Sequence, residues 1–513
     1  MANAVVISRS NLIYGLCLPL AVLLGYLLAE PFESGSVAVV VLVISVLSIP
    51  ILMRWHHPFL IFACNAAIFP YFVPGRPMLW MIMALVSAFF LLLNRSLGRD
   101  VRFFRAPQVS LSLIFLGLVV MAIAYVNGGI GLHYFGSQNT GGKRYLSLMC
   151  GILLYFGLST LAIEGRRAKL AVAVFFLSSL TGLVGYLAAF AGPSSYFLVE
   201  LFPIEAGVNE VGSLSSMGGM GTMGTGDMMM GQGIIRLGGL TGVAIGLFTF
   251  LLARFGLRGT FDLTRPWRML LFLLAVAATL YSGFRSNLIL LLLTVGVLFI
   301  LEGLFRTRLM LILLLIGAVT VAIGLPYTQK LPQPVQRTLC FLPINVDPMV
   351  RQDADNSTNW RLEMWQDVLP TVPKYLIKGK GFGVDAEEMF QIQSSMGAGY
   401  VKPYEEQMYA GNYHSGPLSL IIPLGIFGTL AFVWFVYAAI KVLAQNRRYG
   451  DPALYRINTF LLAYFIVHTF FFVFVFGAIA QDLAVFAGII GLGVSLNGGV
   501  QQPRELLPEP EPE

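Results

Sequence analysis

The sequence has few charged residues. Asp, Glu, Lys and Arg make up 12% of the 513 residues, whereas 57% are apolar and the mean hydropathy is +0.77. An ordinary soluble domain is about one quarter charged. With 13% aromatic residues and 54 glycines in addition, this composition excludes a disordered chain, a coiled coil and a basic nucleic-acid-binding protein. It predicts an all-α fold, a polytopic bundle of transmembrane helices surrounded by membrane lipids.

Cysteine and recognisable cofactor motifs are also scarce. Cys17, Cys64 and Cys150 lie in apolar stretches and Cys340 lies in a polar one, so the spacing predicts no disulfide framework. The segment 378–383, Lys-Gly-Lys-Gly-Phe-Gly, lacks the Gly-Lys-Ser/Thr ending of a phosphate-binding loop. No DxD-like metal motif occurs in the first external loop. We therefore expect neither a metal nor a cofactor.

Apolar windows of about 17 to 25 residues predict fourteen spanning helices, and the short ones make the range twelve to fourteen. The first window leads into further spans, which indicates an anchor rather than a cleaved signal. The predicted spans are 12–29, 35–53, 57–73, 77–93, 108–126, 144–163, 168–191, 233–254, 267–282, 286–301, 308–324, 416–441, 455–476 and 479–497.

Basic residues divide unevenly between the two sides of this topology. With the N-terminus inside, cytoplasmic segments hold 20 of the 33 Lys and Arg residues, short external loops hold 5, and the long loop before residue 416 holds 8. Short cytoplasmic loops are enriched in Lys and Arg. The distribution predicts both termini in the cytoplasm of a bacterium, a multi-pass inner membrane location, and large loops that face the periplasm.

Two external segments are long. Segment 192–232 contains a run of Gly, Met, Ser and Thr at 212–233, which favours a flexible flap, with a thioether copper site as the weaker alternative. Segment 325–415 is long enough for a subdomain, and its centre predicts a helix that begins near 357–359 and ends before Pro370. The expected organisation is spans one to eleven in 1–324, the periplasmic loop 325–415, spans twelve to fourteen in 416–497, and a disordered cytoplasmic tail at 498–513.

One histidine stands at the predicted external end of a span. His414 precedes Ser415-Gly416-Pro417, where proline suits the first turn of a helix. The positive end of a helix dipole disfavours an imidazolium ion, and a neutral imidazole can act as a general base. The alternative is a histidine that only anchors the helix at the interface.

The residues that follow His414 form a pattern. His414 and Ser415 are separated by nine residues from Gly425, which is followed by Gly428 and Thr429. This pattern resembles the signature of the O-antigen ligase family. Two further stretches are similar to that family: 282–286, Ser-Gly-Phe-Arg-Ser, and 360–365, Trp-Arg-Leu-Glu-Met-Trp, which leads to the glycine-rich turn at 379–383.

The resemblance covers roughly residues 270 to 440. It implies a metal-independent, inverting glycosyltransferase that moves a glycan from undecaprenyl diphosphate to a glycan or lipid acceptor, such as lipid A-core, on the periplasmic side. It makes His414 the base, and Arg285 and Arg361 the groups that hold the diphosphate. Two features depart from the family: Ile289 stands where its pattern has leucine, and fourteen spans exceed its usual number of about twelve.

The residues support parts of this site without the resemblance. Arginine offers planar, bidentate donors to phosphate oxygens, and Arg285 lies in a tight external turn between two spans, where snorkelling to headgroups is the alternative. For Arg361 the alternative is a surface salt bridge with Glu363 or Asp355. Lys143 and Arg144 could bind substrate phosphate or anchor their helix.

Three more acidic residues are weaker candidates. Asp482 could orient a sugar, although a helix cap is the simpler interpretation. Glu405 and Glu406 could contact the acceptor, although they also suit a solvated surface.

Two other functions remain open. A polymerase of the same superfamily would join carrier-linked repeats instead of capping a lipid, and Gly428-Thr429 leans slightly toward the ligase. A flippase or transporter of lipid-linked glycans would suit fourteen spans. However, the predicted spans hold almost no ionisable residue besides His468, and coupled transporters usually need several.

Overall fold

The computed structural model is mainly helical, and no strand occurs among the residues that it describes. These residues are 18, 19, 21, 22, 25, 34–71, 73, 75–96, 103–127, 141–203, 236–384, 390, 404, 408 and 411–503. The chain divides into two units, 1–56 and 57–513. The predicted all-α fold is therefore confirmed, whereas the flap at 212–233, Glu405, Glu406 and most of the first predicted span lie outside the described residues.

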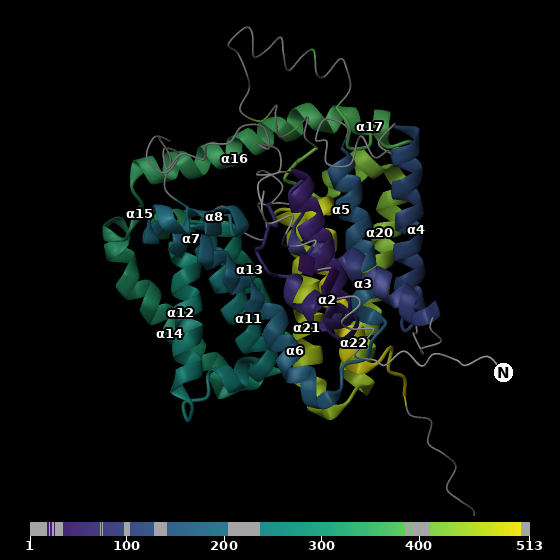
Figure 1. Ribbon diagram of the computed structural model, residues 1–513. Coiled ribbons are helices and arrows are strands. Elements are labelled where there is room, and N and C mark those ends of the chain that lie inside the picture. The colour runs from purple at the N-terminus through teal and green to yellow at the C-terminus, as the bar shows by residue number, and fades with distance from the viewer. Residues whose placement is uncertain are drawn as a thin grey trace, which may run out of the picture. The chain divides into compact units, whose positions relative to one another are not determined.

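The N-terminal helices run from α2 to α8 and are coloured purple to blue in Figure 1. Segment 165–191 is one span interrupted by the 3₁₀ turn Ser178–Thr181. The bounds are α2 Ser34–Ala63, α3 Leu79–Ser96, α4 Pro107–Val126, α5 Gly142–Ser159, α6 Gly165–Leu177, α7 Gly182–Ala191 and α8 Tyr196–Leu201.

The remaining helices follow α8 along the chain, and some of them belong to the segment between α14 and α20. Their bounds are α11 Gly238–Thr260, α12 Pro266–Tyr281, α13 Arg285–Leu301, α14 Arg308–Gly324, α15 Gln333–Leu339, α16 Pro348–Val368, α17 Val372–Tyr375, α20 Gly416–Tyr449, α21 Tyr455–Phe474 and α22 Ile479–Asn497.

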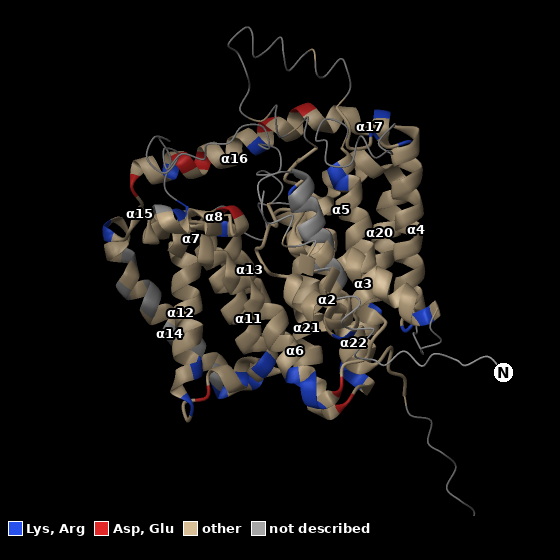
Figure 2. Ribbon diagram, in the orientation of Figure 1, with Lys and Arg blue, Asp and Glu red and all other residues tan. Residues whose placement is uncertain are grey.

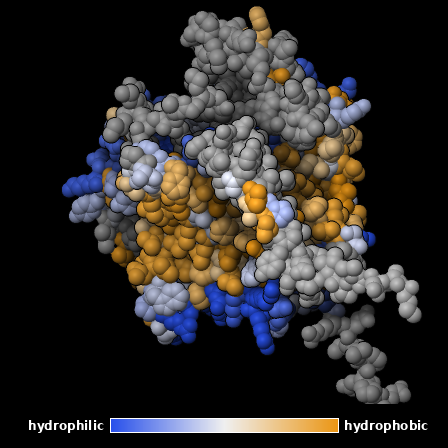
Figure 3. All heavy atoms as spheres, in the orientation of Figure 1, coloured by the Kyte–Doolittle hydropathy of each residue, from blue (hydrophilic) through white to orange (hydrophobic). Residues whose placement is uncertain are grey.

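Seven of the described helical segments are long and apolar enough to cross a membrane, so the predicted count of fourteen is not reached by this criterion. They are 79–96, 107–126, 165–191, 238–260, 416–449, 452–474 and 479–497. The last two are the most enclosed, with 72% and 78% of their apolar windows buried. Figure 3 shows the apolar residues as a band on the visible face, with hydrophilic residues below it.

Within unit 57–513 the helices form two packed groups that α20 and α21 connect. Helix α5 packs against α3, α4 and α22, and α11 packs against α6, α7, α12 and α21. Helix α20 contacts α4, α21 and α22, and α21 contacts α13 and α22. This packing brings the starts of α5, α13, α20 and α22 to the same end of the unit, where α16 lies across them (Figure 1).

The predicted span 57–73 is wrong. Helix α2 continues through residue 57 and ends at Ala63, and the described residues 64–71 are not helical. Their polar groups find partners in other segments: Asn65 Nδ2 donates to Phe175 O (2.8 Å), and Ala67 N donates to Thr181 Oγ1 (2.9 Å). Irregular backbone is tolerated at membrane depth where protein satisfies it. The prolines at 70, 74 and 77 disfavour a new helix here.

The helix in the long segment 325–415 also begins earlier than predicted. Asp347 is its N-cap and accepts a hydrogen bond from Met349 N (2.8 Å), and Pro348 occupies the first turn. Residues 357–359 are therefore helix interior rather than N-caps. The predicted end is correct, because the α-helix stops at Val368 and a 3₁₀ turn carries Pro370.

Candidate active site

Arg285 is placed by a tight turn between α12 and α13. Gly283 has φ +78°, a conformation that favours glycine, and Arg285 is the first residue of α13. Its guanidinium donates to Ala354 O (3.1 Å) and Thr358 Oγ1 (3.3 Å) on α16. Arg285 therefore joins the end of the membrane bundle to the helix that crosses it.

Arg337 holds the same turn from another side. It is 3% exposed and donates from Nη1 to Gly283 O (2.6 Å) and from Nε to Asp353 Oδ2 (2.5 Å). Nη2 of a second arginine, Arg236, lies 4.0 Å from the same Asp353 oxygen, and its guanidinium carbon lies 5.9 Å from the centre of the Phe284 ring. The Asp353 carboxylate therefore lies near two arginines, and the region around it keeps a net positive charge.

The three arginines line a cavity of about 220 Å³ at the end of the bundle where α13 begins. Four arginines contribute to its wall: Arg236, Arg285, Arg337 and Arg361. Phe284 and Phe476 add aromatic surface, and Asn287 is fixed by its hydrogen bond to Thr241 Oγ1 (2.8 Å). A cavity with this charge suits a diphosphate, because arginine donors match its oxygens.

His414 adjoins this cavity. Its ring lies between Trp360 of α16 and Phe476, with ring centres 5.0 Å apart in each pair and edge-to-face geometry. Phe476 also lines the cavity, and Arg361 is close enough to repel an imidazolium ion. Among the described residues, Nδ1 of His414 has no hydrogen-bond partner although it is buried.

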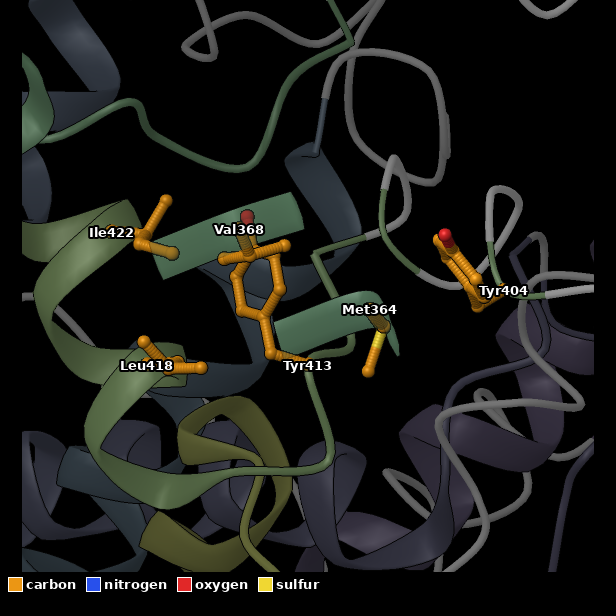
Figure 4. Close-up of a cluster of buried hydrophobic side chains, with 6 residues drawn as sticks. All are labelled: Met364, Val368, Tyr404, Tyr413, Leu418 and Ile422. Atoms are coloured by element: carbon orange, nitrogen blue, oxygen red, sulfur yellow. The ribbon is translucent and has the colours of Figure 1, made fainter. Parts of the chain in front are cut away.

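Residues that pack around Tyr413 hold the backbone of His414 in an uncommon conformation. Its φ of +49° is uncommon for a residue with a side chain. The preceding Tyr413 O accepts from Trp365 Nε1 (2.7 Å). Figure 4 shows Tyr413 beside Met364, Val368, Leu418 and Ile422, the apolar cluster by which α16 packs on the start of α20. This cluster supports a conformation that the histidine alone would disfavour.

The surroundings of His414 keep its imidazole ring neutral. Burial first, and then the positive charge of Arg361, lower the pKa of His414 from 6.5 to about 3. The sequence argument assigned this effect to the helix dipole, but burial of the ring is the larger cause. The site therefore presents an uncharged imidazole at neutral pH.

The glycines of the sequence motif lie within α20, at and next to a break in this helix. Gly425 has φ +61° and breaks α20 into two segments. At this break Lys380 N donates to Ile422 O (2.8 Å), Gly381 N donates to Pro423 O (3.0 Å), and Ile426 N donates to Leu376 O (2.7 Å). The glycine-rich turn at 379–383 is thus joined to α20 by backbone hydrogen bonds.

The other motif residues surround this joint. Gly428 faces Leu424, and a Cβ at 428 would lie within 2.3 Å of the Leu424 Cβ. Thr429 Oγ1 donates to Gly425 O (2.9 Å), and Ser415 is the extended residue that precedes α20. Gly428 and Thr429 thus pack within α20 next to its break, and only Ser415 lies beside His414.

Lys143 and Arg144 do not line the arginine cavity. They contribute to a second cavity of about 110 Å³ together with Arg76, Trp80 and Gln481. Arg144 also lies with its guanidinium carbon 6.0 Å from the centre of the Phe382 ring. The structure thus assigns the predicted cations to two separate places.

Asp482 occupies a buried turn rather than an open site. Its Oδ2 accepts from Ala478 N (2.7 Å), which is a helix-start contact for α22, and its Oδ1 lies 3.2 Å from His468 Nε2. Ser419 Oγ accepts from Ile479 N (3.1 Å) and ties the same turn to α20. These contacts hold the segment that carries Phe476 against His414.

Sequence reasoning therefore found three residues that the structure brings together, Arg285, Arg361 and His414. It missed Arg236 and Arg337 as members of the cavity. Arg236 follows a low-complexity run and Arg337 lies in a short polar helix, so neither has a local pattern that indicates a site.

Residues 270–433 match the family model described as O-antigen ligase. The resemblance to the O-antigen ligase family is confirmed over these residues. The match supports an enzyme of glycosyltransferase type from the ligase and polymerase superfamily. No curated protein matches the chain.

The O-antigen ligase region runs from α12 into α20. It contains His414 and three of the four arginines of the cavity, Arg285, Arg337 and Arg361. Arg236, Lys143 and Arg144 precede it. The arginine cavity is thus built largely by the region that matches the ligase family.

Proposed function

We propose that the protein transfers a glycan from undecaprenyl diphosphate to an acceptor hydroxyl at the periplasmic face of the inner membrane, as an O-antigen ligase does. The single observation that carries this proposal is the arginine cavity beside a neutral histidine. A lipid diphosphate brings two negative charges to the membrane surface, and Arg285 and Arg361 would hold them. Arg236 adds a third cation at the cavity wall.

In the proposed reaction, His414 takes the proton of the acceptor hydroxyl as its oxygen attacks the anomeric carbon of the donor. The bond between that carbon and the diphosphate oxygen breaks, and undecaprenyl diphosphate leaves with the electron pair. The arginines stabilise the charge that develops on the leaving group. One displacement inverts the anomeric carbon, and the step requires no metal.

Donor binding would also prepare the base. The bound diphosphate would neutralise Arg361 and place negative charge near the ring, and both effects raise the pKa of His414 from its low value in the empty site. A base with a higher pKa accepts a proton more readily. His414 would therefore gain basicity when the donor is in place.

Complementation tests the proposal. Expression in a strain that lacks its own ligase should restore glycan-capped lipopolysaccharide on gels, and EDTA should leave transfer by the purified protein unchanged. Arg285→Gln and Arg361→Gln should lose capping, whereas Arg167→Gln, at an exposed position of α6, should retain it. A His414→Ala variant that still transfers would remove the base from the mechanism.

The same experiment separates the ligase from a polymerase. Restored capping with chains of unchanged length supports the ligase. Restored chain length in a strain that lacks only its polymerase, without capping in the ligase-deficient strain, would support the polymerase instead.

A further inference from the structure

The second cationic cavity is distinct from the diphosphate site described above. Arg76, Lys143 and Arg144 line it at the start of α5, beside Trp80 and Gln481. Arg76 and Lys143 are close enough for their charges to repel. Among the described residues, Arg76 pairs with Glu200 (3.4 Å), and no carboxylate lies within ion-pair distance of Lys143 or Arg144. The cavity therefore holds an excess of positive charge.

Arg144 connects this cavity to the segment that carries His414. Arg144 Nη1 is packed against Gly411, where an added Cβ would lie 2.8 Å from it, and Arg144 interacts electrostatically with Tyr413. His414, the next residue, contacts Trp360 and Phe476 at the arginine cavity. The segment 411–414 thus contacts lining residues of both cationic cavities, Arg144 of the second and Phe476 of the first.

The start of α22 connects the same two places. Phe476 lines the arginine cavity, and Ala480 and Gln481 line the second one. Ser147 Oγ of α5 donates to Ala480 O (2.7 Å), which fixes α5 against this turn. Two anionic groups bound in the two cavities would therefore both lie close to the segment that carries His414.

We propose that the second cavity binds a phosphate group of the acceptor, so that the acceptor is a phosphorylated lipid or lipid-linked glycan. This inference rests on the proposed function, which assigns the donor diphosphate to the arginine cavity. Lys143 and Arg144 supply charged donors for phosphate oxygens. Trp80, Met81 and Val485 give the cavity apolar surface that suits a lipid or a sugar ring.

Equilibrium binding to the purified full-length protein tests the site without turnover. The probes are core lipopolysaccharide from a strain that makes no O-antigen, the same lipid with its phosphates removed, and undecaprenyl diphosphate. Lys143→Gln should weaken binding of phosphorylated core lipid about tenfold, because one charge-assisted hydrogen bond is lost. Its binding of the diphosphate at the arginine cavity should change less than about twofold. Arg285→Gln should show the reverse pattern.

Controls separate binding from folding. Arg167→Gln, another exposed basic position, should bind both lipids as the unmodified protein does. Arg144→Lys keeps the charge and should retain part of the affinity. Thermal unfolding of each variant should match that of the unmodified protein.

Several outcomes decide the question. Equal weakening of both lipids by Lys143→Gln, or equal binding of core lipid with and without phosphate, would overturn the proposal. If a second undecaprenyl diphosphate binds in a Lys143-dependent manner and core lipid does not, the acceptor phosphate belongs to a second carrier, and the site stands. Lys143-dependent binding without any transfer would reject the proposed function alone, and transfer that is unaffected by Lys143→Gln would reject this site alone.

Discussion

At the scale of single residues, His414 combines an uncommon backbone conformation with a buried ring. Its φ of +49° is stabilised by the hydrogen bond from Trp365 to Tyr413 O and by the apolar cluster of Tyr413. Strained residues persist only where the surrounding structure holds them, and they cluster at functional sites. The strain here places the imidazole between two aromatic rings at the edge of the cavity.

Removal of the imidazole should slow transfer strongly without unfolding the protein. A positioned general base contributes typically 10²–10⁴-fold to a rate. We expect His414→Gln to lower kcat by at least about a hundredfold, with donor affinity changed little because the arginines remain. Single-turnover transfer and donor binding, measured on the same preparation, check both parts. An active His414→Gln variant would contradict the assignment.

The pH profile should depend on donor concentration. In the empty site the pKa of His414 is about 3, so its neutral form persists as pH falls from 8 to 5. The rate at limiting donor reports the free enzyme and should be flat over this range. At saturating donor the diphosphate raises the pKa, so the rate should fall at a higher pH as the ring becomes protonated. Coincident midpoints would show that the donor does not bind near His414.

Asp353 is expected to support the site through Arg337. Loss of its charge leaves a buried guanidinium without full compensation, which is strongly unfavourable. Asp353→Asn should lower the free energy of unfolding by about 1–3 kcal/mol and weaken donor binding, because the turn that carries Arg285 loses its support. Asp355→Asn is the matched control, since Asp355 is exposed on the same helix. Equal effects of the two changes in thermal unfolding would argue against this role.

At the scale of elements, the two glycine motifs of the sequence form one joint. The turn 379–381 supplies backbone donors to the carbonyls that α20 leaves open at its break near Gly425. Gly379 has φ +70°, and a Cβ there would lie 2.5 Å from Pro423 O. The turn and the break of α20 therefore both require glycine. Their joint links the segment between α14 and α20 to the helix that follows His414.

Gly379→Ala should disrupt this joint. The left-handed conformation and the contact with Pro423 together predict a loss of about 2 kcal/mol or more in stability, with reduced transfer. Gly296→Ala in α13 is the control, because a Cβ there meets no atom within 4 Å and helix interiors favour alanine. Thermal unfolding in detergent measures both. Similar melting temperatures for the two variants would show that the joint does not contribute.

Most elements were predictable because their apolar windows are long. The errors arose where tertiary contacts replaced local signals. The region 57–73 is apolar enough for a span, but its non-helical part is held by tertiary hydrogen bonds, from the Asn65 side chain to a carbonyl of α6 and from Ala67 N to the Thr181 hydroxyl in the turn after α6. The early start of α16 depends on the Asp347 cap, which lies outside the apolar pattern that indicated the helix.

At the scale of the molecule, the candidate site was only partly predictable. Arg285 and His414 follow or precede apolar spans, so their external ends could be assigned from hydropathy. The separation of Lys143 and Arg144 from the arginine cavity, and the inclusion of Arg236 and Arg337 in it, depend on which helices are neighbours. Helix packing is not encoded in local spacing, and the sequence therefore left these positions open.

The two ends of the bundle differ in charge. Lys and Arg gather where α6, α12 and α14 begin and where α11 and α20 end (Figure 2). The site residues Arg285, Arg361 and His414 belong to the opposite end, which α16 crosses. Short cytoplasmic loops are rich in Lys and Arg, so we expect the site to face the periplasm.

Cysteine labelling should reveal this orientation directly. In a background without the four native cysteines, Gln366→Cys lies at an exposed position of α16, and Leu263→Cys lies in the connection between α11 and α12, where Leu263 is 77% exposed. A membrane-impermeant maleimide should label the first variant in intact spheroplasts and the second only after permeabilisation. Labelling of both in detergent controls for accessibility. The reverse pattern would place the site in the cytoplasm and would remove the basis for transfer at the periplasmic face.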